Sequence, residues 1–182
     1  MIINDQLAAI QAVQHLIDIG CKKIAHIRGL VNPQNAIDRF LGYKKALEKN
    51  EIAYQSDLVY TCERVSFEEG YAFAQQILQE HPDVDGIFVI TDLVAVGVLA
   101  YFNEQKIPVP GQIAVIGFSN WFMSQVITPK LSTVDQPSYE MGVQAFQLLL
   151  EEMICHRDQK PFEPKTIELK TAIIERESTL KS

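Results

Sequence analysis

The sequence predicts an α/β protein with a doubly wound, mainly parallel sheet and helices on both faces. Residues 86–90 and 113–116 form continuous apolar runs that do not alternate with polar residues. Both faces of each run are therefore expected to be covered, as in a parallel sheet between two helical layers. Helical patterns before, between and after these runs indicate right-handed β-α-β crossovers.

The individual elements follow from spacing and from end signals. Asn4 or Asp5 can cap a first helix that continues to about Gly20, and Pro108 and Pro110 follow a fourth helix. No helix is evident between Trp121 and the next proline. Helices are predicted at about 5–20, 36–49, 67–78, 92–105 and 139–156, and strands at 23–27, 58–60, 86–90, 113–116, 166–169 and 172–174. The last helix has apolar residues well round its cylinder, which predicts burial on more than one side.

Composition excludes several classes of function. The chain has 182 residues, with 16 basic and 23 acidic residues and a net charge of −7. A domain that grips DNA through its phosphates needs a basic face, so this chain is not expected to bind DNA by itself. It has neither a secretion-signal pattern nor an apolar run near the ~20 residues that span a bilayer. We therefore expect a cytoplasmic protein without membrane contact.

Metal and cofactor signatures are also lacking. Cys21, Cys62 and Cys155 lie far apart without a CxxC pair, which argues against a disulfide framework or a zinc site. The histidines have no metal-ligand spacing, and no GxGxxG or P-loop sequence is present. We expect no metal and no cofactor.

Ligands of open parallel sheets bind beyond the carboxyl ends of the strands. In these segments Arg39 offers directed hydrogen bonds to an oxygen-rich ligand, although an arginine early in a helix can also lie on the surface. Thr91 ends a strand and can simply cap the next helix. Trp121, the only tryptophan, can stack on a sugar or base ring or serve as a core or interface anchor.

One segment approaches a catalytic motif. Gly117-Phe118-Ser119-Asn120-Trp121 follows a buried strand, where a hydrolase would carry G-x-S-x-G. Trp121 stands where the tight turn requires glycine, and Ser119 would also need a histidine and an acid. We therefore expect no catalytic residues and no enzyme.

Several segments in order resemble the LacI/GalR family of transcriptional regulators, and together they cover nearly the whole chain. They are Asn4-Asp5, His15-Leu16-Ile17 with Gly20, 24–29, 39–43 with Ala46-Leu47, Gly70-Tyr71, 87–92 with Ala95 and Gly97, 109–118, 129–137 and Arg176-Glu177-Ser178-Thr179.

The resemblance implies two α/β subdomains that close on an effector, behind an N-terminal helix-turn-helix and a hinge. This chain is then expected to begin near the crossover between subdomains. Residues 1–136 would form the second subdomain, 137–157 a helix returning to an absent first subdomain, and 158–182 strands that rejoin the second.

By position, Arg39 resembles the family's effector-binding arginine. Asn35 and Thr91 fall at further ligand-facing positions, and Val65 falls where some relatives have an aromatic residue. Ser119 departs from the family pattern, in which an aspartate is common. Asn120 or Trp121 is then expected to supply part of the contact.

The resemblance implies a small sugar-like or nucleobase-like effector, most simply a carbohydrate. It also implies a homodimer that reaches DNA only through a segment preceding this chain. A periplasmic sugar-binding protein of the same fold is the alternative, and it would require an export signal upstream.

Overall fold

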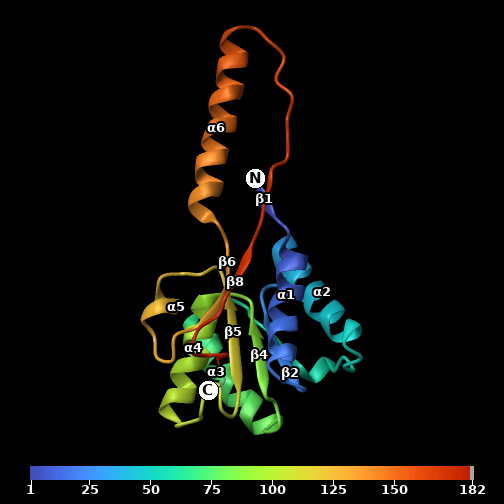
Figure 1. The fold of residues 1–182 in the computed structure, drawn as a ribbon, viewed down its shortest axis with the longest axis vertical. Coiled ribbons are helices and arrows are strands. Elements are labelled where there is room, and N and C mark those ends of the chain that lie inside the picture. Colours follow the sequence, from blue (N-terminus) through green and yellow to red (C-terminus); the bar gives the residue numbers. More distant parts are fainter. Residues whose placement is uncertain (181–182) are drawn as a thin grey trace.

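The computed structural model describes residues 1–180 and contains a six-stranded sheet in the order β3-β2-β4-β5-β6-β8 (Figure 1). All neighbouring strands are parallel except β6 and β8, which pair antiparallel. The strands are β2 (Ile24–Arg28), β3 (Val59–Thr61), β4 (Gly86–Val89), β5 (Ala114–Phe118), β6 (Ser132–Asp135) and β8 (Ala172–Ile174). The predicted doubly wound, mainly parallel fold is confirmed.

Helices cover both faces of this sheet, with α1 and α2 on one face and α3 and α4 on the other (Figure 1). Asn4 caps α1, because its Oδ1 accepts a hydrogen bond of 3.0 Å from the amide of Leu7. Helix α2 begins two residues earlier than predicted, directly after Pro33. The four helices are α1 (Asp5–Asp18), α2 (Gln34–Lys49), α3 (Phe67–Glu80) and α4 (Asp92–Glu104).

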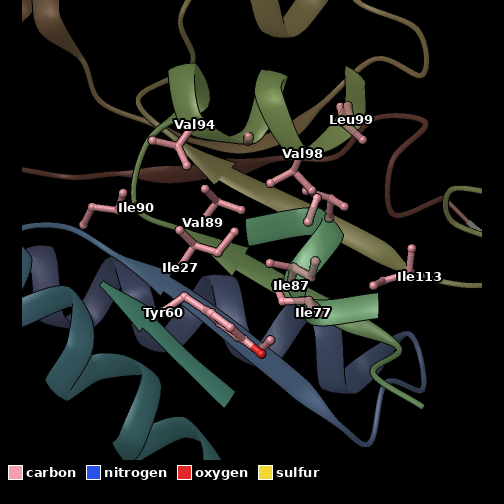
Figure 2. Packing of buried hydrophobic residues seen from close by; sticks show 14 of the residues in the cluster. Ile27, Tyr60, Ile77, Ile87, Val89, Ile90, Val94, Val98, Leu99 and Ile113 are labelled. Carbon is pink, nitrogen blue, oxygen red and sulfur yellow. The ribbon is translucent and has the colours of Figure 1, made fainter. Parts of the chain in front are cut away.

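The core consists of two apolar layers because successive residues of a strand point to opposite faces. In β2, Ala25 and Ile27 join the layer under α3 and α4, which Figure 2 shows. Ile24 faces the layer under α1 and α2, together with Phe88 and Phe118. Strands β4 and β5 are buried at every residue, as their continuous apolar runs predicted.

The last helix leaves this body. Helix α6 (Ser138–Arg157) has no buried residue and projects beyond the sheet beside the returning chain (Figure 1). β1 (Ile2–Ile3) pairs there with β7 (Glu168–Leu169). Strand β7 was expected to rejoin the second subdomain, but it lies outside the main sheet. Strand β7 lies in the part of the chain that projects with α6, before the chain re-enters the sheet at Ala172. A one-turn helix, α5 (Met123–Val126), occupies the segment where none was evident.

Two glycines allow α3 and α4 to touch through their backbones. A Cβ on Gly70 would collide with the carbonyl of Val94, and one on Gly97 would collide with the carbonyl of Phe67. This close crossing fixes the outer helical layer on the sheet.

A histidine is completely buried in the other layer. His26 Nδ1 lies 2.9 Å from the carbonyl oxygen of Phe88, and its ring stacks on Phe88 and Tyr43. Its Nε2 has no hydrogen-bond partner within residues 1–180. Burial lowers the pKa of His26 from 6.5 to about 3, so the ring is neutral in the folded protein.

Substituting Gly97 by alanine should destabilise the protein by about 1–3 kcal/mol, because the methyl group forces two packed helices apart. Gly142→Ala is the matched control, since its Cβ meets no atom within 4 Å on the exposed α6. It should stabilise by about 0.4–1 kcal/mol, because alanine restricts the unfolded chain. Urea unfolding measures both. Equal effects would contradict the close-crossing explanation.

His26 should make the protein less stable in acid. Its pKa is lower in the folded state, so the unfolded state binds the proton first below pH 6.5. Stability is then complete above pH 6.5 and falls towards pH 3, by about 1.4 kcal/mol per pH unit. The free energy of unfolding of His26→Leu should depend less steeply on pH between 6 and 4. Identical slopes for both proteins would refute this role.

Candidate functional site

A pocket of about 220 Å³ opens at the carboxyl ends of the first strands of the sheet. Its wall comes from the β2–α2 loop, from α2, from the β3–α3 loop and from the end of β4. Four of the residues predicted as ligand-facing lie in this wall, namely Asn35, Arg39, Val65 and Thr91; Gly29, Leu30, Pro33, Ala36 and Ile90 complete it.

Arg39 is the centre of the site and is only 3% exposed, so a surface position is wrong. Its Nε and Nη2 both lie 2.7 Å from Oδ1 of Asp5, the first residue of α1. Nη1 donates a hydrogen bond of 2.8 Å to the carbonyl of Ile90, in the pocket wall. The guanidinium carbon lies 3.5 Å from the centre of the Phe118 ring. These contacts fix the guanidinium between two helices and the sheet.

Two carboxylates balance the buried charge. Burial lowers the pKa of Arg39, and the charges of Asp5 and Asp92 oppose that shift, so the guanidinium stays protonated. Asp92 accepts hydrogen bonds of 2.6 Å from the Thr133 hydroxyl and 2.7 Å from the amide of Trp121. Burial raises the pKa of Asp92, and these hydrogen bonds partly offset the rise.

The other wall residues offer polar groups or shape. Asn35 is exposed, and its Oδ1 accepts a 2.9 Å hydrogen bond from the amide of Ala36, while its side-chain nitrogen donates no hydrogen bond within residues 1–180. The hydroxyl of Thr91 caps α4 by accepting a bond of 3.4 Å from Val94, so the predicted capping role is confirmed. Val65, in the β3–α3 loop, lines the pocket with a φ of 54°, which is rare for a β-branched residue.

The second predicted segment, Ser119 to Trp121, forms a strained turn after β5. Ser119 has a φ of 112° and Asn120 a φ of 50°. Among residues 1–180, the pocket wall includes none of these three. Trp121 is 42% exposed and meets Phe122 edge-on, so it is not a core anchor. Its amide contact to Asp92 connects the turn to the rim at Thr91.

The side chain of Asn120 is occupied within the protein. Its amide nitrogen donates a 2.8 Å hydrogen bond to Asp135, the last residue of β6. Its oxygen accepts a 2.7 Å hydrogen bond from Nη2 of Arg176, whose Nη1 bonds the carbonyl of Leu131. Asn120 therefore holds the turn against β6 and the C-terminal segment.

The hydrolase alternative lacks its partners. Across residues 1–180, Ser119 has no hydrogen bond to a histidine or to an acidic side chain. The described residues also contain no group of three or more His, Cys, Asp or Glu side chains that could hold a metal ion. None of the helices described is long and apolar enough to cross a membrane.

Sequence reasoning missed Asp5, Asp92 and Arg176 as parts of the site. Asp5 lies 34 residues before Arg39, and such a pairing is invisible without the fold. One signal was available, because Arg39 sits at helical spacing between the inner residues Ala36 and Tyr43. An arginine on the inner face of a helix must be paired, which demands a buried carboxylate nearby.

The sequence matches the periplasmic binding protein-like domain family over residues 13–179. A ribose operon repressor from Halalkalibacterium halodurans is 31% identical over 168 residues, which cover 92% of this chain and 48% of the relative. The crystal structure of the transcription regulator CcpA of Lactococcus lactis aligns with a TM-score of 0.88 and 32% identity, covering 98% of this chain and 63% of that one.

A complex of the transcriptional regulator CelR with cellobiose also aligns with a TM-score of 0.88, at 28% identity, over 97% of this chain and 52% of that chain. The present chain spans about half the length of the curated relatives that it matches.

Proposed function

Because the chain belongs to the periplasmic binding protein-like domain family, in the form carried by LacI-type regulators, we propose that it is the ligand-sensing and oligomerisation region of a DNA-binding transcriptional regulator. One observation carries the proposal: four predicted residues from separate segments converge on a pocket around a buried guanidinium. A site of this kind recognises a ligand, and its described residues supply no nucleophile with a base.

The proposed effector is a small carbohydrate. The guanidinium of Arg39, the amide of Asn35 and the hydroxyl of Thr91 match the alternating donors and acceptors of sugar hydroxyls. The names of two relatives, a ribose operon repressor and a regulator complexed with cellobiose, support this choice. Ser119 and Trp121 would close over the ligand from the neighbouring turn, with Asn120 holding that turn in place.

The projecting helix is proposed to contact the first subdomain of a longer polypeptide. In α6, Tyr139 is 85% exposed, and Phe146 and Met153 are more than half exposed. A helix with this much apolar surface is expected to be covered by another element. The shorter span of this chain relative to its relatives supports a preceding half that supplies the cover.

DNA binding is assigned to a segment preceding these residues, because a net charge of −7 disfavours direct contact with phosphates. We propose a cytoplasmic homodimer in which effector binding closes two subdomains and changes the spacing of paired DNA-binding heads. The residues of this chain would hold the effector and transmit closure through the crossovers at Asp5 and Asp135.

In the complete polypeptide, Arg39→Met should weaken sugar binding at least tenfold, because a charged hydrogen bond contributes about 1.5–3 kcal/mol. Calorimetry with a panel of neutral sugars that includes ribose and cellobiose measures the loss. If Arg39→Met folds poorly, Arg39→Lys is the second variant, because lysine keeps a positive charge beside Asp5.

Arg157→Met serves as the control. This substitution removes the same charge, but Arg157 is exposed on α6. Sugar binding that tolerates Arg39→Met, or that falls equally in the control, would contradict the proposed site. The 182-residue chain alone should bind sugar more weakly than the complete polypeptide, because the cleft is half formed.

The exposed face of α6 should make the 182-residue chain self-associate at high concentration. Sedimentation velocity should show oligomers whose population falls when Phe146 and Met153 are replaced by glutamate. As a control, Gln147 and Glu152, which are exposed on the same helix, are both replaced by alanine. A protein that is strictly monomeric at high concentration would refute this function of α6.

A further inference from the structure

Arg39 is the only ionisable residue in the described wall of the pocket, and its charge is already neutralised from inside the protein. We infer that Asp5 is a specificity-determining residue that restricts this pocket to uncharged ligands. This inference rests on the proposed ligand-binding function of the pocket. It adds that the ligand is uncharged, and that Asp5, which lies outside the pocket wall, determines this.

The geometry leaves Arg39 able to bind a ligand without offering it a free charge. A guanidinium has five N–H groups. Nε donates one of them to Asp5 Oδ1 at 2.7 Å, Nη2 lies 2.7 Å from the same oxygen, and Nη1 donates another to the carbonyl of Ile90 at 2.8 Å. Nη1 and Nη2 each keep an N–H group for hydroxyl or carbonyl oxygens. An anionic ligand would instead share the guanidinium with a carboxylate that cannot move away, because Asp5 opens helix α1.

The surrounding charges reinforce this neutrality. The side chains of Arg39 and Asp5 are only 4% and 15% exposed, so solvent screens their interaction little. Asp92 lies close enough for its charge to act on Arg39, and the charge of Arg176 acts on Asp92. Arg39 therefore has two carboxylates, Asp5 and Asp92, close enough to act on its charge. An added phosphate or carboxylate would be an unbalanced negative charge in a site of low polarity.

Asp5 is not needed as the cap of helix α1. Asn4 already provides the side-chain cap of α1 through its bond to Leu7. Among residues 1–180, the carboxylate of Asp5 hydrogen-bonds only to Arg39. Its charge can therefore be removed while its shape and acceptor oxygen are kept, because asparagine is nearly isosteric with aspartate.

The test uses inorganic phosphate as an anionic probe of Arg39. In Asp5→Asn, phosphate should bind at least tenfold more tightly than in the unchanged chain, followed by the NMR signal of the Arg39 Nε–H group. Asp18→Asn is the control, because Asp18 is exposed at the far end of α1 and its loss changes the net charge equally. Asp5→Ser gives a second neutral variant should Asp5→Asn lose its fold.

A gain in Asp5→Asn that disappears when Arg39→Met is added would support the inference. Equal phosphate affinity in the unchanged chain, Asp5→Asn and Asp18→Asn would overturn it, as would no detectable binding in both Asp5 variants. The test does not depend on the natural effector. If the complete polypeptide failed to bind any sugar, the proposed function would fall while this charge measurement kept its meaning.

Discussion

The site depends on placing one positive charge where water scarcely reaches it. An isolated ion is costly to bury, so the folded chain must surround Arg39 with acceptors before any ligand arrives. Asp5 meets this requirement from the start of α1, and Ile90 meets it with a carbonyl that lies just beyond the end of β4. The ring of Phe118 covers the remaining face. The packing of α1 against α2 and the length of β4 are therefore parts of the site.

Unusual backbone geometry occurs at the same edge of the sheet. Val65, in the loop after β3, and Ser119 and Asn120, in the turn after β5, all have positive φ angles. Such conformations cost of order 1–3 kcal/mol each and persist only where neighbours fix them. For the turn after β5, the amide of Ser119 bonds the carbonyl of Val134, and Asn120 is held from both sides. The tertiary contacts thus maintain a shape that local preference would abandon.

The apolar runs of β4 and β5 could be predicted from sequence because burial on both faces leaves a continuous pattern. Helix α5 could not, because four residues are too few to show a period. The β1–β7 pair was also beyond reach, since two-residue strands carry no alternation. Arg39 and Thr91 were indicated by their positions after predicted strands, and Asn35 and Val65 came from family resemblance. Asp5, the partner of Arg39, and Arg176, the partner of Asn120, required the fold, because no local pattern links positions far apart in the chain.

The chain crosses between the sheet body and the projection three times, after Ile3, after Asp135 and before Ala172. The last two lie side by side, because Asp135 pairs with Ala172 in the sheet. Connections that lie side by side resist sliding past each other more than they resist bending about the line that they share. Arg39 and Asn120 hydrogen-bond to Asp5 and Asp135, which lie beside two of these crossings, so both side chains connect the candidate site to the segments that join the two parts of the chain.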